Sequence, residues 1–225
     1  LELHIEQGPV LEAERKAIGI VAGVQHMSRH SVSFTGTSTH AGPTPMPMRK
    51  DPVRALSELL PGLYRLPAEL GADTRVTVGI INTEPGSANT VPERVNLTVD
   101  LRHPEQAVYT RLLAELERHV AIASEHAGVQ GKTRCLWQSA GIVFAPNCVT
   151  AIERATEALG LCSMTLTSGA GHDSCHLAKV APTGMIFIPC EGGVSHNEAE
   201  SITPGQATDG ANTLLLTMME LANQP

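Results

Sequence analysis

The segment VNLTVDLR, residues 95–102, alternates apolar and polar side chains without interruption. Alternation with a period of two is typical of a β-strand, because successive side chains point to opposite faces of a sheet. One face of this strand is therefore predicted to be buried, and the other to be solvated or to carry function. The apolar set is Val95, Leu97, Val99 and Leu101, and the polar set is Asn96, Thr98, Asp100 and Arg102.

The segments on either side of this strand extend it to a compact α/β unit. Asp51 followed by Pro52 predicts the start of one helix, because an aspartate cap and a proline at the first helical position are both favoured there. A second helix is predicted after Pro104. The resulting order βαββαβ is the split βαβ, ferredoxin-like motif, which we expect over residues 24–138. Its strands are predicted at residues 31–35, 75–81, 95–102 and 133–137.

The residues outside this unit, 1–23 and 139–225, are predicted to form one further α/β domain in two pieces. In the last helix, Thr203 and Gln206 match a capping box. Strands are predicted at residues 1–7, 18–21, 164–168 and 184–189, and helices from Asn147 to near Gly160 and from Thr203 onward. The apolar stripe predicted to face inward on the last helix is Ala211, Leu214, Leu215, Met218 and Leu221. The predicted fold class is thus an α/β domain with a mixed sheet, interrupted by a ferredoxin-like insert.

Charge and composition exclude several classes of function. The formal net charge of −7 argues against a nucleic-acid partner, because such proteins normally carry a basic footprint. No stretch approaches the roughly 20 apolar residues that span a bilayer, so no membrane partner is expected. The five cysteines are an odd, dispersed set without a CxxC pair. This pattern favours free thiols in a reducing compartment, and hence a cytoplasmic protein.

His4 lies between two carboxylates in the first predicted strand. If residues 1–7 are extended, Glu2, His4 and Glu6 share one face. Such a face suits a metal or acid/base site, and it equally suits a solvated edge strand.

Three other histidines lie in loop-like segments at the ends of predicted elements. His196, within EGGVSHNEAE, follows the strand at 184–189, where α/β sheets gather their chemistry. It is either a metal ligand or a loop-capping residue. His172, within SGAGHDSCHLA, follows small residues that can let a backbone approach a ligand or can simply turn into a helix. His40 lies in a segment rich in proline and glycine, from which it can reach another surface.

Motifs of other chemistries are absent from the sequence. No GxSxG elbow, phosphate-binding P-loop or GxGxxG follows a predicted strand, and no HExxH pair occurs.

Five ordered segments together resemble one family. ELHIEQGPVLE, THAGPTPM, NTVPERVNLTVDLRH, SGAGHD and SHNEAE are similar to the carbamoylase and allantoate amidohydrolase branch of the M20 metallopeptidase superfamily. Its members hydrolyse N-carbamoyl-L-amino acids, β-ureidopropionate or allantoate. The resemblance implies a catalytic domain with two divalent metal ions (zinc, manganese, cobalt or nickel) and an inserted domain that forms a homodimer. The implied substrate is a small ureido or amide compound with a carboxylate.

The resemblance also implies a role for individual residues. His40 resembles a catalytic, substrate-binding histidine that reaches the neighbouring subunit's site and polarises the scissile carbonyl. An arginine suits carboxylate binding, because its planar fork meets a carboxylate bidentately. The implied metal ligands are His4 and His196, and the implied substrate contacts are Gln7, His40, Asn89, Arg102 and Gly171.

The family's remaining metal ligands and its general-base glutamate would precede residue 1, so the resemblance predicts that the sequence is a C-terminal fragment. With two histidines and no bridging aspartate, the fragment is expected to be metal-poor and inactive. The complete enzyme would carry out metal-assisted hydrolysis, with His40 stabilising the tetrahedral oxyanion. Two alternatives stay open: another M20 activity, such as an aminoacylase or dipeptidase, and a non-catalytic dimerisation module.

Overall fold

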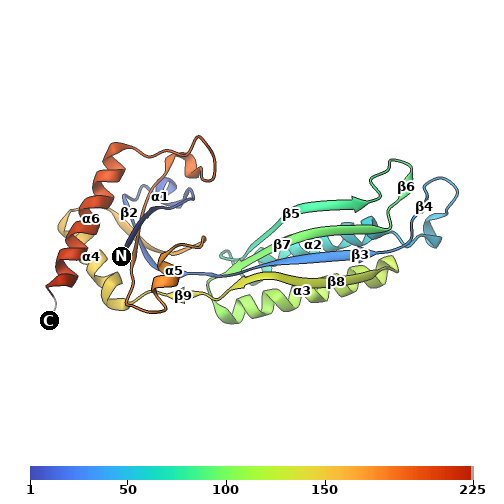
Figure 1. Ribbon diagram of the computed structural model, residues 1–225, viewed down its shortest axis with the longest axis horizontal. Coiled ribbons are helices and arrows are strands. Elements are labelled where there is room, and N and C mark those ends of the chain that lie inside the picture. Colours follow the sequence, from blue (N-terminus) through green and yellow to red (C-terminus); the bar gives the residue numbers. More distant parts are fainter. Residues whose placement is uncertain (224–225) are drawn as a thin grey trace. The chain divides into compact units, whose positions relative to one another are not determined.

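The computed structural model describes residues 1–223, which fall into two compact units (Figure 1). Unit 1 consists of Leu1–Gln25 together with the segment from Gly141 onward, and unit 2 consists of His26–Ala140. No helix in the described part of the chain is both long enough and apolar enough to cross a membrane.

Unit 1 is built on a mixed five-stranded sheet. Its strands run in the order β1-β11-β2-β10, and β9 also pairs with β2. β1 is parallel to β11 and β10 is parallel to β2, whereas β11 and β9 are antiparallel to β2. The strands are β1 (Glu2–Ile5), β2 (Ile18–Val24), β9 (Ile142–Val143), β10 (Ser163–Ser168) and β11 (Met185–Ile188).

Helices cover this sheet because its central strands are apolar on both faces. All four residues of β11 are buried, as are most of β2. A strand that reads as a continuous apolar run is typical of a sheet buried on both faces. The core joins Ile18, Ile20, Ile152, Ile186 and Ile188. The helices are α1 (Val10–Ala13), α4 (Pro146–Ala158), α5 (Ser174–Leu177), α6 (Pro204–Ala222) and the 3-10 turn η2 (Glu191–Gly193).

The structure corrects two of the sequence predictions for these helices and confirms a third. Asn147 does not cap α4: the N-cap is Ala145, and Pro146 takes the first helical position. The capping box of α6 is confirmed, with Gln206 N donating to Thr203 Oγ1 and Thr203 N donating to the Gln206 side chain. The inward stripe predicted for α6 is partly wrong, because Ala211, Leu215 and Met218 are exposed.

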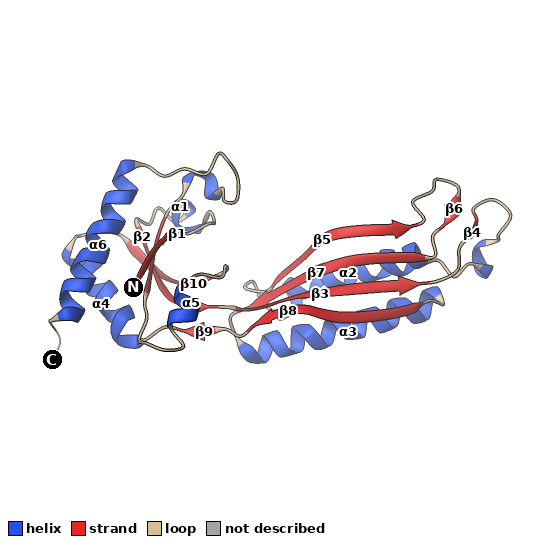
Figure 2. Cartoon of the chain, in the orientation of Figure 1, coloured by secondary structure: helices blue, strands red, loops and turns tan. Residues whose placement is uncertain are grey.

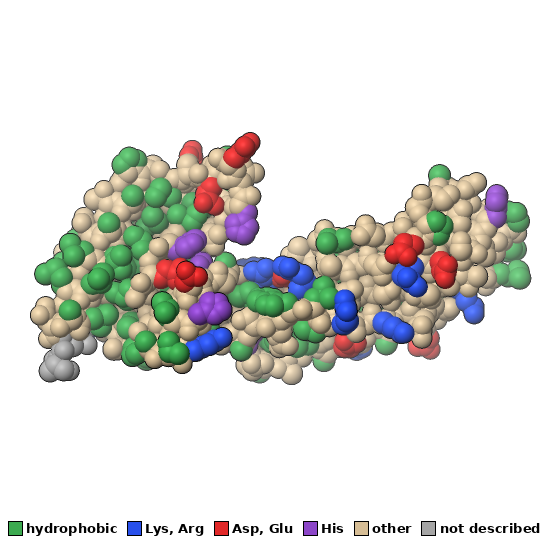
Figure 3. Space-filling model, in the orientation of Figure 1, with side chains coloured by type: hydrophobic (Ala, Val, Ile, Leu, Met, Phe, Trp, Pro, Cys, Tyr) green, Lys and Arg blue, Asp and Glu red, His purple; other side chains and the backbone are tan. Residues whose placement is uncertain are grey.

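The buried face of α6 consists of small residues. Gly210, Thr213 and Thr217 are buried. A Cβ on Gly210 would lie 2.7 Å from Ile188 and 2.9 Å from Leu3, so the helix approaches the sheet closely at this point. The apolar residues Leu215, Met218 and Met219 are left on the surface. Apolar side chains are visible over this side of unit 1 in the space-filling view (Figure 3).

Unit 2 is an antiparallel four-stranded sheet whose two long helices lie on one face (Figure 2). The sheet order is β5-β7-β3-β8, so β5 and β8 form its edges. Along the chain the main elements follow the predicted order βαββαβ. They are β3 (His26–Thr35), α2 (Pro52–Leu70), β5 (Arg75–Glu84), β7 (Arg94–His103), α3 (Gln106–Ala127) and β8 (Gln130–Ser139), with β4 (Thr39–His40), η1 (Met46–Met48) and β6 (Thr90–Val91) inserted between them.

The core of unit 2 lies between the sheet and the helices. The carboxylate of Asp51 accepts a 2.9 Å hydrogen bond from Val53 N, which caps α2 as predicted. The predicted strand 95–102 lies within β7, which alternates between buried and half-buried residues from Val95 to His103. Its buried set, Val95, Leu97, Val99 and Leu101, packs against the helices. The polar set, with Asp100 and Arg102, therefore lies on the other face of the sheet.

Candidate active site

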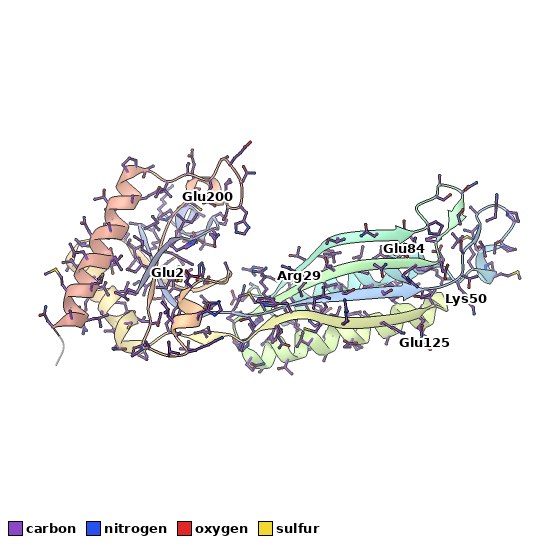
Figure 4. The ribbon with its side chains drawn as sticks, in the orientation of Figure 1. Glu2, Arg29, Lys50, Glu84, Glu125 and Glu200 are labelled. Carbon is purple, nitrogen blue, oxygen red and sulfur yellow. The ribbon has the colours of Figure 1, made fainter. Side chains whose placement is uncertain are left out.

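β1 places Glu2 and His4 on one face of the unit 1 sheet. His4 pairs in register with Phe187 of the buried strand β11. Both side chains are half-buried, and they are two residues apart, so they project to the same side. Figure 4 labels Glu2 on this strand. The strand ends at Ile5, so the predicted extension to residue 7 is wrong.

Glu6 consequently does not share the face of His4. Its carboxylate accepts hydrogen bonds from Val10 N (3.0 Å) and Leu11 N (2.8 Å), and so binds the first turn of α1. Burial raises the pKa of Glu6, and these two hydrogen bonds act in the opposite direction. Glu6 therefore serves the local structure, while Glu2 is the carboxylate beside His4.

His172 lies against His4, although the two residues are far apart in sequence. The ring centroids are 4.8 Å apart in an edge-to-face arrangement. Glu2 Oε2 accepts a 2.6 Å hydrogen bond from Ser174 N, just beyond His172. The potential ligand atoms of Glu2, His4 and His172 all lie within 4.8 Å of one another. Over residues 1–223 this is the one group of three or more His, Cys, Asp or Glu side chains arranged to hold a metal ion.

Hydrogen bonds fix which ring nitrogen of each histidine keeps its lone pair. His4 Nδ1 lies 2.8 Å from Ile5 O, which can only accept, so Nδ1 carries the proton and Nε2 keeps the lone pair. His172 Nε2 lies 2.8 Å from Ser168 Oγ. The same hydroxyl lies 3.1 Å from Ala170 O. In the tautomer that lets Ser168 donate to Ala170 O, His172 Nε2–H donates to Ser168 and Nδ1 keeps the lone pair.

Burial keeps His172 neutral. Its side chain is only 8% exposed, and desolvation lowers its pKa to about 4, with a further decrease from His4. Glu2 and Asp173 act in the opposite direction but do not overcome burial. A neutral imidazole is the form that binds a metal ion. From the sequence we predict only that His172 lies in a loop. Its contact with His4 depends on the order of the strands in the sheet, which the sequence does not show.

Gln7 and the segment around His196 meet at a second contact. Gln7 Nε2 donates a 3.0 Å hydrogen bond to Ser195 Oγ, which joins HIEQG to SHNEAE. Gln7 and His196 both have positive φ, 58° and 55°, which is uncommon for residues with a side chain. His196 N donates to Glu200 Oε2 over 3.2 Å, and the His196 side chain is exposed. His196 does not belong to the three-residue group of Glu2, His4 and His172.

Gly171 lies directly before His172 on an open part of the surface. A Cβ built there would meet nothing within 4 Å among the described atoms. Nothing in unit 1 therefore requires glycine at this position. The absence of a side chain leaves the backbone open to a ligand, which is the role that the family resemblance implies for it.

His40 and Asn89 lie together in a small two-stranded sheet of unit 2. His40 pairs with Thr90 across β4 and β6, and Ala41 N donates a 2.9 Å hydrogen bond to Asn89 O. The His40 side chain is exposed, and its Nδ1 accepts from Gly42 N at 3.1 Å. In the neutral ring the proton is then on Nε2, so His40 offers a hydrogen-bond donor.

Arg102 forms a bidentate pair with Asp100 on the open face of β7. Arg102 Nε lies 2.6 Å from Asp100 Oδ1, and Nη2 lies 3.1 Å from Oδ2. Arg29, labelled in Figure 4, also approaches Asp100, at 3.6 Å. The Asp100 carboxylate thus lies beside two guanidinium groups. To bind a substrate carboxylate, Arg102 would have to contact that carboxylate and Asp100 at the same time.

The chain matches the model of the family "Peptidase family M20/M25/M40" over residues 1–220, and it belongs to that family. Within the family it falls in the branch of N-carbamoyl-L-amino-acid amidohydrolases, allantoate amidohydrolases and ureidoglycolate hydrolases. The predicted resemblance is confirmed. Proteins of this family use divalent metal ions, so a metal centre built on imidazole and carboxylate ligands fits the family.

Three relatives define this placement. An N-carbamoyl-L-amino-acid amidohydrolase of Rhizobium meliloti is 40% identical over 221 residues, which is 98% of this chain and 53% of the relative. An allantoate amidohydrolase of Escherichia coli K12 is 34% identical over 100% of this chain and 54% of the relative. The structure of an amidase of the hydantoinase/carbamoylase family from Burkholderia multivorans superposes with a TM-score of 0.94 at 43% identity, over 99% of this chain and 54% of that one. The chain thus spans about half the length of these relatives.

Proposed function

We propose that the protein containing this chain is a metal-dependent amidohydrolase that cleaves a ureido C–N bond of an N-carbamoyl amino acid or an allantoate-like compound. The observation that carries the proposal is the hydrogen bond from Gln7 to Ser195, which brings two motifs of the branch together across the sequence. The relatives in this branch are named for these reactions. Among the open alternatives, no contact in the described residues favours an aminoacylase or a dipeptidase.

His4 and His196 are our proposed ligands for the two divalent ions. His4 presents an unprotonated Nε2 beside Glu2, and His196 follows Ser195 in the loop that Gln7 contacts. A bound divalent ion supplies Lewis-acid polarisation of the scissile carbonyl. We further propose that the other ligands and a general base come from sequence outside these 225 residues, since the relatives are about twice as long. On this account the chain alone does not complete the two-ion centre and does not turn over substrate.

The residues of unit 2 are proposed to bind and polarise the substrate. The Nε2–H of His40 can donate to the oxyanion that develops on the carbonyl oxygen of a substrate in the neighbouring subunit's site. Arg102 and Asn89 are proposed to hold the substrate carboxylate. In unit 1, Gly171 is proposed to contact the substrate through its backbone, and Gln7 through its side-chain amide.

Homodimerisation through unit 2 is also proposed. Both edge strands of its sheet carry exposed apolar side chains, Ile80 and Ile81 on β5 and Leu136 and Trp137 on β8. Exposed edges with apolar side chains are natural sites for pairing with another chain. A sedimentation mass of twice the monomer would support this, and a monomer at assay concentration would refute it.

The activity is tested by ammonia release from N-carbamoyl-L-amino acids and from allantoate. We expect the complete protein to release ammonia from at least one of them and the 225-residue chain to release none. Hydrolysis of dipeptides or N-acyl amino acids alone would instead support another M20 activity. No hydrolysis by the complete protein, together with a stable dimer, would support a non-catalytic dimerisation module.

A further inference from the structure

We propose that Glu2, His4 and His172 form a site that binds one divalent ion of the zinc type in this chain on its own. Their ligand atoms lie within 4.8 Å of one another at the edge of the unit 1 sheet. The family resemblance implies only His4 and His196 as metal ligands in this chain, and the expectation of weak metal binding rests on that pair. The structure adds a carboxylate and a second imidazole beside His4, and these change that expectation.

In this cluster His4 Nε2 and His172 Nδ1 each have a lone pair that faces no hydrogen-bond donor among residues 1–223. His4 Nδ1 is held by Ile5 O and His172 Nε2 by Ser168 Oγ, so the opposite nitrogen of each ring is the acceptor. Within residues 1–223 neither His4 Nε2 nor His172 Nδ1 accepts a hydrogen bond. His172 is more than nine-tenths buried, and an unsatisfied buried acceptor costs free energy. A cation between the two rings would satisfy both lone pairs.

The donor set identifies the class of ion. Two imidazoles and one carboxylate are a three-ligand set found in zinc sites that keep a fourth position open. Imidazole nitrogens favour Zn²⁺ or Co²⁺, whereas Mg²⁺ and Ca²⁺ prefer oxygen ligands. Each ligand also makes a hydrogen bond to a neighbouring group. His4 bonds to Ile5 O, His172 to Ser168 Oγ, and Glu2 to Ser174 N. Such outer contacts orient metal ligands and strengthen binding.

The required adjustment is small. In a tetrahedral zinc site the ligand atoms lie about 3.4 Å apart, because each bond is about 2.1 Å long. The present separations of up to 4.8 Å therefore need to contract by up to about 1.4 Å. Glu2 and His4 are half-buried on the short edge strand β1, so rotation of their side chains can supply this contraction while the buried His172 stays in place.

This inference rests on the proposed function only through the shared residue His4. The two-ion centre requires His196 and ligands outside the chain, whereas the present site requires neither. Binding to the 225-residue chain and turnover by the complete protein are separate measurements. Failure of either one leaves the other interpretable.

The test is a titration of the 225-residue chain with Co²⁺, followed by visible absorbance, and with Zn²⁺, followed by calorimetry. We expect one ion per chain. Glu2→Gln and His172→Asn should each weaken binding by at least about tenfold. His176→Ala, which removes an exposed histidine of the neighbouring helix α5, should bind as the wild type does. Circular dichroism checks that each variant is folded.

Glu2→Gln keeps the test decisive if His172→Asn does not fold, because the amide oxygen can still accept from Ser174 N. Paramagnetic shifts from Co²⁺ should appear on the ring signals of His4 and His172. Wild-type affinity in the Glu2→Gln variant, or the absence of any binding by the wild-type chain, would overturn the inference. Loss of binding on His196→Ala with Glu2→Gln unaffected would overturn it as well.

Discussion

The side-chain amide of Gln7 donates a 3.0 Å hydrogen bond to Ser195 Oγ, across 188 positions of sequence. Gln7 follows the strand that carries His4, and Ser195 precedes His196. The bond therefore links the two segments from which the proposed metal ligands arise. Because both Gln7 and His196 have positive φ, each segment holds a backbone conformation that side chains disfavour, and this contact helps to maintain it.

A double-mutant cycle on this pair should reveal their coupling. Gln7→Ala and Ser195→Ala should each lower the free energy of unfolding, because each removes the same partly buried hydrogen bond. The coupling between them should be about 1 kcal/mol, the usual net contribution of such a bond. Urea denaturation of the four proteins measures it. Strictly additive effects would mean that the contact contributes nothing to stability.

His172 should resist protonation far below the usual range of histidine. Its pKa is about 4 because burial disfavours the charged ring, so its NMR ring signals should not titrate between pH 7 and pH 5. The unfolded chain takes up this proton near pH 6.5, and the folded chain does not until about pH 4. The unfolded state therefore binds more protons in this window, and stability falls as the pH is lowered through it.

The pH effect can be isolated with a variant. The total contribution of His172 amounts to about 3 kcal/mol or less between pH 6.5 and pH 4. His172→Gln should remove that part of the pH dependence, while the contributions of His26 and His30, whose pKa values burial also lowers, remain. A His172 titration midpoint near 6.5 would contradict the burial argument.

The close approach of α6 to the sheet predicts a strong effect at one glycine. Gly210→Ala places a methyl group 2.7 Å from Ile188 and 2.9 Å from Leu3, so we expect a loss of about 1–3 kcal/mol of stability. Gly205→Ala is the matched control on the same helix, because its nearest neighbour, Thr203 Oγ1, is 3.8 Å away. Thermal unfolding should leave the control unchanged or slightly stabilised. Equal effects of the two changes would refute this packing.

Arg102 should matter most for substrates that carry a carboxylate. In the complete protein, Arg102→Ala should lower kcat/KM for an N-carbamoyl amino acid by about 10- to 100-fold, as expected for a lost charged hydrogen bond. The corresponding substrate amide should be affected far less. Arg94→Ala, which removes an exposed arginine paired with Glu84, is the control on the same strand. An equal loss for acid and amide would exclude carboxylate binding by Arg102.

The sequence predicts most of the elements because their signals are local. The alternation of β7, the Asp51 cap and the Thr203–Gln206 capping box each depend on residues a few positions apart, and each appears in the structure. The buried face of α6 could not be predicted, because hydrophobicity alone favours Leu215 and Met218. The close approach at Gly210 decides which face is buried, and that depends on tertiary packing.

In the candidate site, too, the local features could be predicted from the sequence and the long-range contacts could not. His4 and Glu2 could be placed on one face from the strand period alone. His172 could not be joined to them, because the contact requires β1 to lie beside β11 and the segment after β10 to return to β1. Glu6 was misplaced for a local reason: the chain leaves the strand at Ile5, and the carboxylate then binds the start of α1.

The most direct test of the account is the metal dependence of ureido hydrolysis by the complete protein. Ammonia release from N-carbamoyl-L-amino acids and from allantoate is measured after metal removal and again after reloading with zinc, manganese, cobalt or nickel. Metal removal should abolish turnover, reloading should restore it, and His4→Ala should prevent the recovery. Turnover that survives both metal removal and His4→Ala would contradict the proposed function.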